Sequence, residues 1–424
     1  MPENLVSPQL ATLKQDIENG KADALTAFWN SILQTGAPLI EPSEDDADKV
    51  WVTFLWRAKE ETRNVVIIGG LAGWDVSQSQ MTRLLNADLW HKSYLARKDL
   101  RMTYRLSAND SLINLSEVRD WKQRTATWQP DPLNPRQFVF PKNEEEPDDE
   151  ETYRSILELP DAPAQLWIKP RPNVPRGNVT VFRLHSAILD NTRRVWVYTP
   201  PDYSSVGEPY PMLILLDGWD YVQVIPTPTM LDNLIAEKRI PPLVAILPSS
   251  LDQKTRSREL ACFPPFVEFL TRELVPWARE HFHVTGDAAK TIVGGSSLGG
   301  LTAAFAGLTA PEYFGNLLSQ SGSFWWKPDD EMESEWLSRQ FALTHKLPLR
   351  FYLDAGLLET GNTRRNGPSM LVVNRHMRNV LQAKGYPGYY AEHNGGHDYL
   401  CWQGTLAEGL IALLGKEIRQ TTQD

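Results

Sequence analysis

The sequence predicts two domains, a smaller all-β domain with a helical start and an α/β domain whose mostly parallel sheet is covered by helices on both faces. With 424 residues, the chain is too long for a single hydrophobic core. Short β-branched and aromatic runs fill its first third, whereas strand-like and helix-like segments alternate after residue 177. We therefore expect domains spanning 1–165 and 166–424.

The first domain should begin with helices, because apolar residues recur at helical spacing over 7–35 with Asn19-Gly20 as a break. Alternating or β-branched runs follow, separated by Gly, Asn and Asp. They cover Val50 to Trp56, Val65 to Ile68, Trp90 to Leu95 and Met102 to Leu106. Several short strands with turn residues between them indicate an immunoglobulin-like sandwich of the E-set type.

An acidic and proline-rich stretch separates the two patterns. The run Glu144 to Glu151 carries like charges that repel one another, which indicates a solvated linker or loop. Prolines then recur from Pro160 to Pro175. We place the domain boundary in this stretch.

Strands and helices alternate in the second domain, as in a parallel sheet with crossover helices. We expect strands at 179–184, 194–199, 212–216, 243–247, 291–293, 317–319, 349–353 and 388–392. We expect helices at 227–237, 265–282, 301–309, 369–384 and 404–417.

One strand-to-helix junction has the sequence of a nucleophile elbow. Gly295-Ser296-Ser297-Leu298-Gly299 follows a β-branched run and precedes a stretch of small residues that suits a buried helix. Such a turn exposes the central serine at the carboxyl edge of the sheet, and it accepts only small residues two positions before and after it. This rule selects Ser297 over Ser296, because centring on Ser296 would put Leu298 where glycine is required. The junction predicts an α/β-hydrolase domain.

A serine nucleophile needs a histidine base and an acid, which follow it along an α/β-hydrolase chain. His393 and His397 both follow the last predicted strand, and the glycine pair before His397 lets its loop curl back, which favours His397. For the acid we favour Glu359, which lies beyond Gly356 in a loop. Asp354, still on its strand, stays an alternative.

Two backbone N–H groups should stabilise the oxyanion of the reaction. One is the amide of Leu298, directly after the nucleophile. The other should come from the loop Asp217-Gly218-Trp219 after an earlier strand, where Gly218 permits the tight turn and the amide of Gly218 or Trp219 points to the site. Asp217 precedes the elbow, so we expect it to have a structural role.

Composition limits the partners and the cellular location. The net charge of −10 argues against nucleic acid or an anionic membrane as the main partner. Two cysteines, Cys262 and Cys401, form neither a disulfide framework nor a metal motif. No export signal or long apolar run is visible, so we expect a soluble, cytoplasmic protein without an obligate protein partner.

Several further motifs accompany the elbow. In the second domain they are Leu215-Leu216-Asp217-Gly218, Arg258-Glu259-Leu260, Glu273-Leu274-Val275-Pro276-Trp277, Ser319 to Trp326 and Gly396-His397-Asp398-Tyr399. In the first domain they are the run 69–75 and Asp131-Pro132-Leu133-Asn134-Pro135. The motifs of the second domain resemble the esterase D-like branch of α/β-hydrolases, and together with the first domain the chain resembles the enterochelin esterase family. The resemblance covers nearly the whole chain.

The resemblance implies a serine esterase that opens ferric enterobactin, whose ligand is a cyclic trilactone of 2,3-dihydroxybenzoylserine, during iron acquisition. Iron would arrive with this siderophore substrate, so neither a cofactor nor protein metal ligands are expected. The anionic catecholates would need cations and flat apolar walls. Lys254, Arg256 and Arg258 offer the cations on a loop after a strand, and Trp219, Phe324, Trp325 and Trp326 offer the walls.

Two other functions stay open at this stage. A carbohydrate-linked ester hydrolase of the feruloyl type would share the catalytic half, although the missing export signal and the basic loop count against it. A non-catalytic siderophore-binding protein could use the same scaffold, although an intact elbow with a well-placed His397 counts against that.

Overall fold

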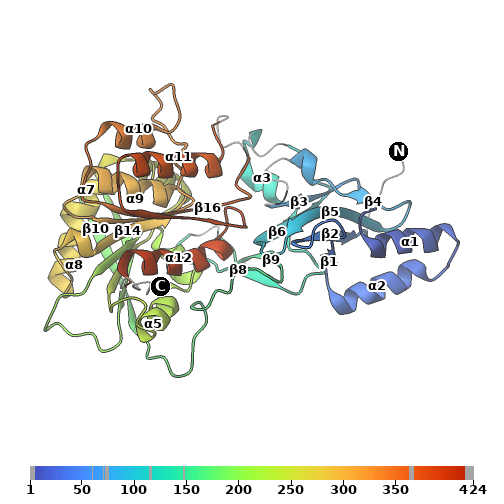
Figure 1. Ribbon diagram of the computed structural model, residues 1–424, viewed down its shortest axis with the longest axis horizontal. Coiled ribbons are helices and arrows are strands. Elements are labelled where there is room, and N and C mark those ends of the chain that lie inside the picture. The colour runs from blue at the N-terminus through green and yellow to red at the C-terminus, as the bar shows by residue number, and fades with distance from the viewer. Residues whose placement is uncertain are drawn as a thin grey trace, which may run out of the picture. The chain divides into compact units, whose positions relative to one another are not determined.

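The computed structural model describes residues 5–59, 61–69, 71, 76–113, 117–146, 149–361 and 367–415. The chain forms two compact units, whose elements are labelled in Figure 1. Unit 1 comprises Met1–Phe140, Glu151–Pro163 and Asn394–Leu400, and unit 2 comprises Pro141–Glu150, Ala164–His393 and Cys401–Asp424. Two short segments therefore lie in a different unit from their neighbours in sequence, and one of them, Asn394–Leu400, carries His397.

Unit 1 contains two antiparallel sheets. Their strands are β1 (Leu39–Pro42), β2 (Lys49–Arg57), β3 (Val65–Ile68), β4 (Thr82–Arg83), β5 (Leu89–Arg97), β6 (Arg101–Ala108), β7 (Trp128–Gln129), β8 (Gln137–Phe140) and β9 (Thr152–Glu158). One sheet has the order β1-β2-β5-β4, and the other has the order β3-β6-β9-β8 with β7 also paired to β6. Phe54 of β2 and Tyr104 of β6 meet edge to face with ring centroids 4.8 Å apart, so the sheets pack on each other. The predicted sandwich is confirmed.

The predicted helical start is also confirmed. Helices α1 (Pro8–Glu18) and α2 (Ala24–Thr35) open the chain, and the short helix α3 (Trp121–Thr125) and the 3₁₀ turn η2 (Val76–Ser79) follow later. Ser7 caps α1, because its hydroxyl accepts the backbone N–H of Leu10 at 3.2 Å. Leu10 and Trp29 share one apolar cluster with Leu55 of β2, which holds the two helices on the first sheet.

The described residues of the acidic run form an exposed loop that also makes ion pairs. Pro147 and Asp148 lie outside the described residues. Glu145 forms ion pairs with two arginines of unit 2, Arg183 and Arg194, and its oxygen lies 2.7 Å from Arg194 Nε. Glu145 is exposed in a loop, as the charge of the run predicts, and it also pairs with opposite charges on β10 and β11.

Unit 2 is built on one sheet of eight strands in the order β10-β11-β13-β12-β14-β15-β16-β17. They are β10 (Asn178–Ser186), β11 (Asn191–Thr199), β12 (Met212–Leu215), β13 (Val244–Pro248), β14 (Thr291–Ser296), β15 (Asn316–Gln320), β16 (Arg350–Gly356) and β17 (Gly388–His393). All strands from β12 onward are parallel, whereas β10 and β11 form an antiparallel hairpin at one side. The carboxyl ends of the parallel strands therefore meet at one edge.

Helices cover both faces of this sheet: α9, α10 and α11 lie on one side, and α5 and α12 lie on the other (Figure 1). The helices are α4 (Gly218–Gln223), α5 (Thr227–Ala236), α6 (Gln253–Glu259), α7 (Pro264–Phe269), α8 (Val275–His281), α9 (Leu298–Thr309), α10 (Trp336–Leu343), α11 (Met370–Ala383) and α12 (Tyr399–Leu414), and η5 (Ala288–Lys290) is a 3₁₀ turn. A π-turn, η4 (Leu270–Leu274), joins α7 to α8 just before Pro276, which has no N–H for a regular helical bond. The predicted α/β fold is confirmed.

Two features of these helices correct the predictions. The cationic segment around Lys254 and Arg256 is helix α6 rather than a loop, and Asp252 caps it by accepting the N–H of Thr255 at 2.7 Å. Helix α12 begins at Tyr399 rather than Gly404, because Asp398 accepts the N–H of Leu400 in its first turn at 3.0 Å.

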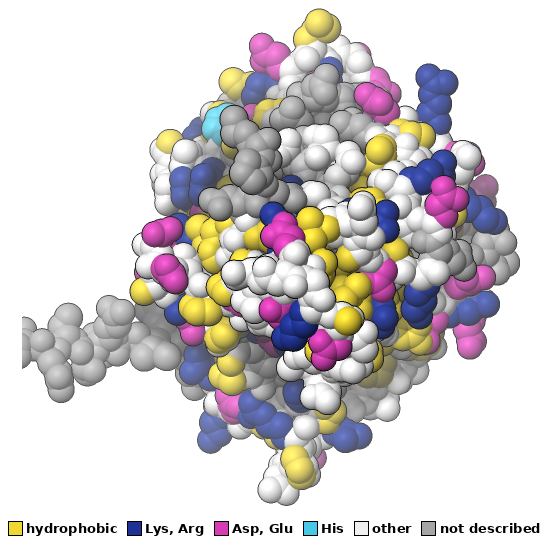
Figure 2. All heavy atoms as spheres, turned by 90° about the vertical axis from the view of Figure 1, so that its right-hand side faces the viewer, with side chains coloured by type: hydrophobic (Ala, Val, Ile, Leu, Met, Phe, Trp, Pro, Cys, Tyr) yellow, Lys and Arg dark blue, Asp and Glu magenta, His cyan; other side chains and the backbone are white. Residues whose placement is uncertain are grey.

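Surface charge is mixed on the face shown in Figure 2, where Lys and Arg alternate with Asp and Glu around apolar side chains. Among the described residues of this face, Lys and Arg side chains do not form one continuous area. None of the helices in the described part of the chain combines the length and the apolar character that a membrane span requires.

Candidate active site

Ser297 stands at a sharp turn between β14 and α9. Its backbone has a φ of 57° and a ψ of −118°, a strained combination for a residue with a side chain. The turn also brings Gly295 against Gly299, since a Cβ placed on Gly295 would lie 2.9 Å from the carbonyl carbon of Gly299. Ser297 is half-buried, whereas Ser296 is 1% exposed. The geometry is that of a nucleophile elbow centred on Ser297.

A second serine, Ser323, contacts the elbow. Its Oγ lies 3.2 Å from Ser297 Oγ, and its backbone N–H donates to the Ser297 carbonyl at 3.0 Å. Ser323 belongs to the loop after β15, at the same edge of the sheet as Ser297. Ser323 was not among the predicted site residues, although it lies in the motif Ser319 to Trp326 that follows a strand.

The two candidate acids lie close together on β16 and in the turn after it. Ser321 connects them, since its N–H donates to Asp354 Oδ1 at 3.1 Å and its hydroxyl donates to Glu359 Oε1 at 2.6 Å. Glu359 Oε1 also accepts the N–H of Gly356 at 2.8 Å. Asp354 is completely buried, and this desolvation raises the pKa of its carboxyl from 3.8 to about 8. Asp354 therefore holds a proton near neutral pH.

The two candidate histidines lie at the carboxyl end of β17 and just beyond it. His393 is its last residue, and His397 lies four residues further along the chain in the segment Asn394–Leu400 of unit 1. Both side chains are partly exposed, whereas Gly395 and Gly396 between them are buried.

The loop between β12 and α4 is tightly built. A Cβ placed on Gly218 would lie 2.1 Å from the Leu247 carbonyl oxygen, so only glycine fits there. Asp217 has a φ of 61°, and its buried carboxylate accepts hydrogen bonds from Ser250 Oγ at 2.7 Å and from Arg256 Nε and one terminal nitrogen of Arg256 at 2.8 and 2.7 Å. These bonds fix the position of the Asp217–Trp219 backbone. The structural role predicted for Asp217 agrees with these contacts.

Arg256 and Arg258 differ in their surroundings. Arg256 forms the bidentate ion pair with Asp217 and exposes 16% of its side chain. Arg258 exposes 59% of its side chain and lies 3.5 Å from Glu259, whose main partner is the buried Arg193 at 2.9 Å. Lys254 is exposed. Arg258 and Lys254 are thus the more accessible cations of α6.

The aromatic residues expected to form flat walls divide into two groups. Trp219, Trp325 and Trp326 are partly exposed, and each lies after the carboxyl end of a parallel strand. Phe324 is completely buried in the apolar core of unit 2. The expectation that its ring lines a substrate site is therefore wrong.

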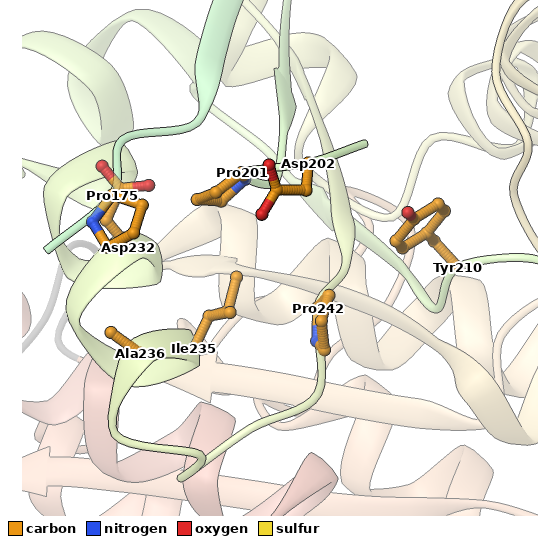
Figure 3. Close-up of a pocket in the computed structure, with 8 residues that line it drawn as sticks. All are labelled: Pro175, Pro201, Asp202, Tyr210, Asp232, Ile235, Ala236 and Pro242. Carbon is orange, nitrogen blue, oxygen red and sulfur yellow. The ribbon is translucent and has the colours of Figure 1, made fainter. Parts of the chain in front are cut away.

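A cavity of about 370 Å³ lies at the other edge of the sheet (Figure 3). It is lined by Pro175, Pro201, Asp202, Tyr210, Asp232, Ile235, Ala236 and Pro242. Tyr210 and Pro242 precede β12 and β13, so the cavity is near the amino ends of the parallel strands, away from the elbow. Asp232 accepts hydrogen bonds from the Tyr198 hydroxyl and the Gly177 N–H, both at 2.8 Å. These bonds connect helix α5 to strand β11 and to the segment before β10. In the described residues, no group of three or more His, Cys, Asp or Glu side chains is arranged to hold a metal ion.

Both halves of the chain match proteins described as esterases. Residues 51–168 match the family model "Enterochelin esterase, N-terminal", and residues 186–413 match the family model "Putative esterase". An iron(III) enterobactin esterase from Dickeya dadantii is 30% identical to this chain, over 98% of each protein. Another from Escherichia coli O6:H1 is 32% identical, over 85% of this chain and 90% of that protein.

Solved structures agree with these matches. The ferric enterobactin esterase of Salmonella typhimurium has a TM-score of 0.73 at 29% identity and covers 92% of this chain and 98% of its own. The enterobactin esterase of Shigella flexneri, solved in the presence of enterobactin, has a TM-score of 0.69 at 28% identity and covers 88% of this chain and 95% of its own.

Proposed function

Because this chain belongs to the iron(III) enterobactin esterase family, we propose that it hydrolyses the ester bonds of enterobactin and of its ferric complex with Ser297 as the nucleophile. The products would be linear chains and single units of 2,3-dihydroxybenzoylserine. The observation that carries this proposal is the strained backbone of Ser297 between β14 and α9. Membership of this family does not favour the two alternatives, a carbohydrate-linked ester hydrolase and a non-catalytic siderophore-binding protein.

In the proposed reaction, Ser297 Oγ attacks a lactone carbonyl carbon while His397 accepts the serine proton. The amides of Leu298 and of Gly218 or Trp219 donate to the resulting oxyanion. When this intermediate collapses, the ester C–O bond breaks and His397 delivers the proton to the leaving serine oxygen of the substrate. Water then attacks the acyl-enzyme with His397 again as the base, which releases a carboxylic acid and restores Ser297.

Glu359 is the acid that we assign to orient His397. An orienting acid must be negatively charged to stabilise an imidazolium. The raised pKa of Asp354, about 8, keeps that carboxyl neutral near pH 7, which supports Glu359 over Asp354. We assign Asp354 to the hydrogen-bonded support beneath Glu359, through their shared partner Ser321.

Substrate recognition in this proposal uses the accessible cations and indoles. Lys254 and Arg258 would attract the anionic ferric catecholates, and Trp219, Trp325 and Trp326 would provide flat surfaces for the aromatic rings. The iron belongs to the substrate, and the proposal includes no resident cofactor. It also places the enzyme in the cytoplasm, which fractionation of cells followed by immunoblotting would test.

The decisive experiment compares Ser297→Ala with Ser296→Ala. Release of 2,3-dihydroxybenzoylserine is measured from ferric and iron-free enterobactin, with a feruloyl ester as a third substrate. We expect Ser297→Ala to lose at least about a thousandfold in kcat, whereas Ser296→Ala keeps most of the activity on both forms of enterobactin. An inactive Ser296→Ala beside an active Ser297→Ala would move the nucleophile. Preference for the feruloyl ester would overturn the substrate assignment.

A further inference from the structure

Strand β6 of unit 1 has a stretch of edge that no strand of the described residues covers. On one side, β9 pairs with Arg101–Tyr104. On the other side, β3 pairs only with Arg105–Ala108. The sheet order β3-β6-β9 puts these partners on opposite edges. The backbone of residues 101–104 is therefore open toward the β3 side of the sheet.

The segment Asn394–Leu400 occupies this edge. The N–H of Arg101 donates to the Asn394 carbonyl at 3.0 Å. Two residues on, the N–H of Thr103 and its hydroxyl both donate to Asp398 Oδ2 at 2.6 Å. Residues two apart on a strand point their N–H groups to the same edge, so the segment occupies two N–H groups on the part of the edge that β3 leaves uncovered.

Asp398 joins this edge to the helix that follows it. Its carboxylate is 5% exposed, and its second oxygen accepts the N–H of Leu400 at the start of α12 at 3.0 Å. A buried carboxylate is costly to leave without donors, so these bonds hold residue 398 in one place. At the other end of the segment, Asn394 Nδ2 donates to Asp99 Oδ1 at 2.6 Å.

We infer that Thr103 and Asp398 are positioning residues for His397, an inference that rests on the base role proposed for that histidine. His397 lies between the anchors at Asn394 and Asp398, on a segment that contains Gly395 and Gly396. Two glycines allow many backbone conformations, and a general base must be held in one of them. The hydrogen bonds from β6 limit that freedom. Unit 1 therefore holds the segment that carries the proposed base.

The test uses Thr103→Val, which keeps the shape and the backbone N–H but removes the hydroxyl bond to Asp398. Thr103→Ser restores that hydroxyl. Thr53→Val is the matched control, because Thr53 is a buried strand residue of the same unit whose hydroxyl bonds Ser93 at 2.8 Å. Asp398→Asn provides a second perturbation of the same contact. Enterobactin hydrolysis is measured for each full-length variant together with its melting temperature.

We expect Thr103→Val to lower kcat about tenfold with little change in KM, because geometry at the base is disturbed while substrate binding is retained. Thr103→Ser should retain kcat within about twofold, Asp398→Asn should lose at least as much as Thr103→Val, and Thr53→Val should keep wild-type kinetics. Equal kinetics of the two valine variants, or an unchanged kcat in Asp398→Asn, would overturn the inference. Retained activity in His397→Ala would instead overturn the assignment of the base.

Discussion

Asp354→Asn should stabilise the protein at alkaline pH and do so much less at acidic pH. The carboxyl of Asp354 is buried on β16, and its pKa rises from an ordinary 3.8 to about 8. A group whose pKa is higher in the folded state binds its proton more tightly there. Its contribution to stability is complete below the unfolded pKa and is lost as the pH rises through the folded pKa. Asparagine is neutral at every pH, so the variant escapes this loss.

The size of the effect follows from the two pKa values. Between pH 3.8 and 8 the free energy of unfolding falls by about 1.4 kcal/mol for each pH unit. In this range the Asp354 carboxyl keeps its proton in the folded state but loses it in the unfolded state. From pH 6 to pH 9 the wild type should therefore lose about 3 kcal/mol relative to the variant. For a domain the size of unit 2, this corresponds to a difference of roughly 6 to 12 °C in melting temperature.

Thermal melting at constant ionic strength from pH 6 to pH 9 provides the assay. The measured quantity is the melting temperature of Asp354→Asn minus that of the wild type, which cancels other groups that titrate in both proteins. Asp330→Asn is the control, because Asp330 is an exposed acidic residue of the same unit and the same substitution is made there. If the difference for Asp354→Asn stays constant or shrinks toward pH 9, the carboxyl is not neutral in the folded protein and the reasoning fails.

The remaining predictions concern the catalytic and substrate-binding residues. His397→Ala should lower kcat about as severely as Ser297→Ala, and Glu359→Gln should cost less than either, since orienting the imidazole is a smaller contribution; initial rates on enterobactin measure both, and a larger loss for Asp354→Asn would exchange the acids. Arg256→Gln should reduce hydrolysis of ferric enterobactin and of a small neutral ester by similar factors, because it leaves the buried Asp217 carboxylate without its cation. Arg258→Gln should weaken only the reaction of the anionic substrate, and raised salt should narrow that gap. If Arg256→Gln slowed the hydrolysis of ferric enterobactin but not that of the neutral ester, Arg256 would contact the substrate directly.

The parts of the fold and site that the sequence predicted are those with local signals. The elbow is a five-residue pattern, and the strands of unit 2 are continuous apolar runs because both faces of the sheet are covered. Strands β8 and β9 were missed because they border the charged run and are only partly buried. Short strands of this kind have weak patterns of their own.

The features of the site that were not predicted depend on hydrogen-bonded residues that are distant along the chain. The bond between Thr103 and Asp398 joins residues 295 positions apart, and the pair of Asp217 and Arg256 spans 39. Residue types alone made Arg256 look like a free cation, because its partner is visible only after folding. The neutral state of Asp354 likewise arises from complete burial, which no local pattern specifies.

The edge of β6 also bears on how the protein avoids association with itself. An uncovered strand edge displays N–H and carbonyl groups that can template pairing with another chain, and proteins commonly block such edges. In unit 1 the blocking segment is Asn394–Leu400, whose backbone and Asp398 carboxylate occupy the N–H groups of Arg101 and Thr103. The segment that carries the proposed base is thus also a guard against intermolecular β-sheet growth. The same few hydrogen bonds therefore both anchor this segment and cover the strand edge.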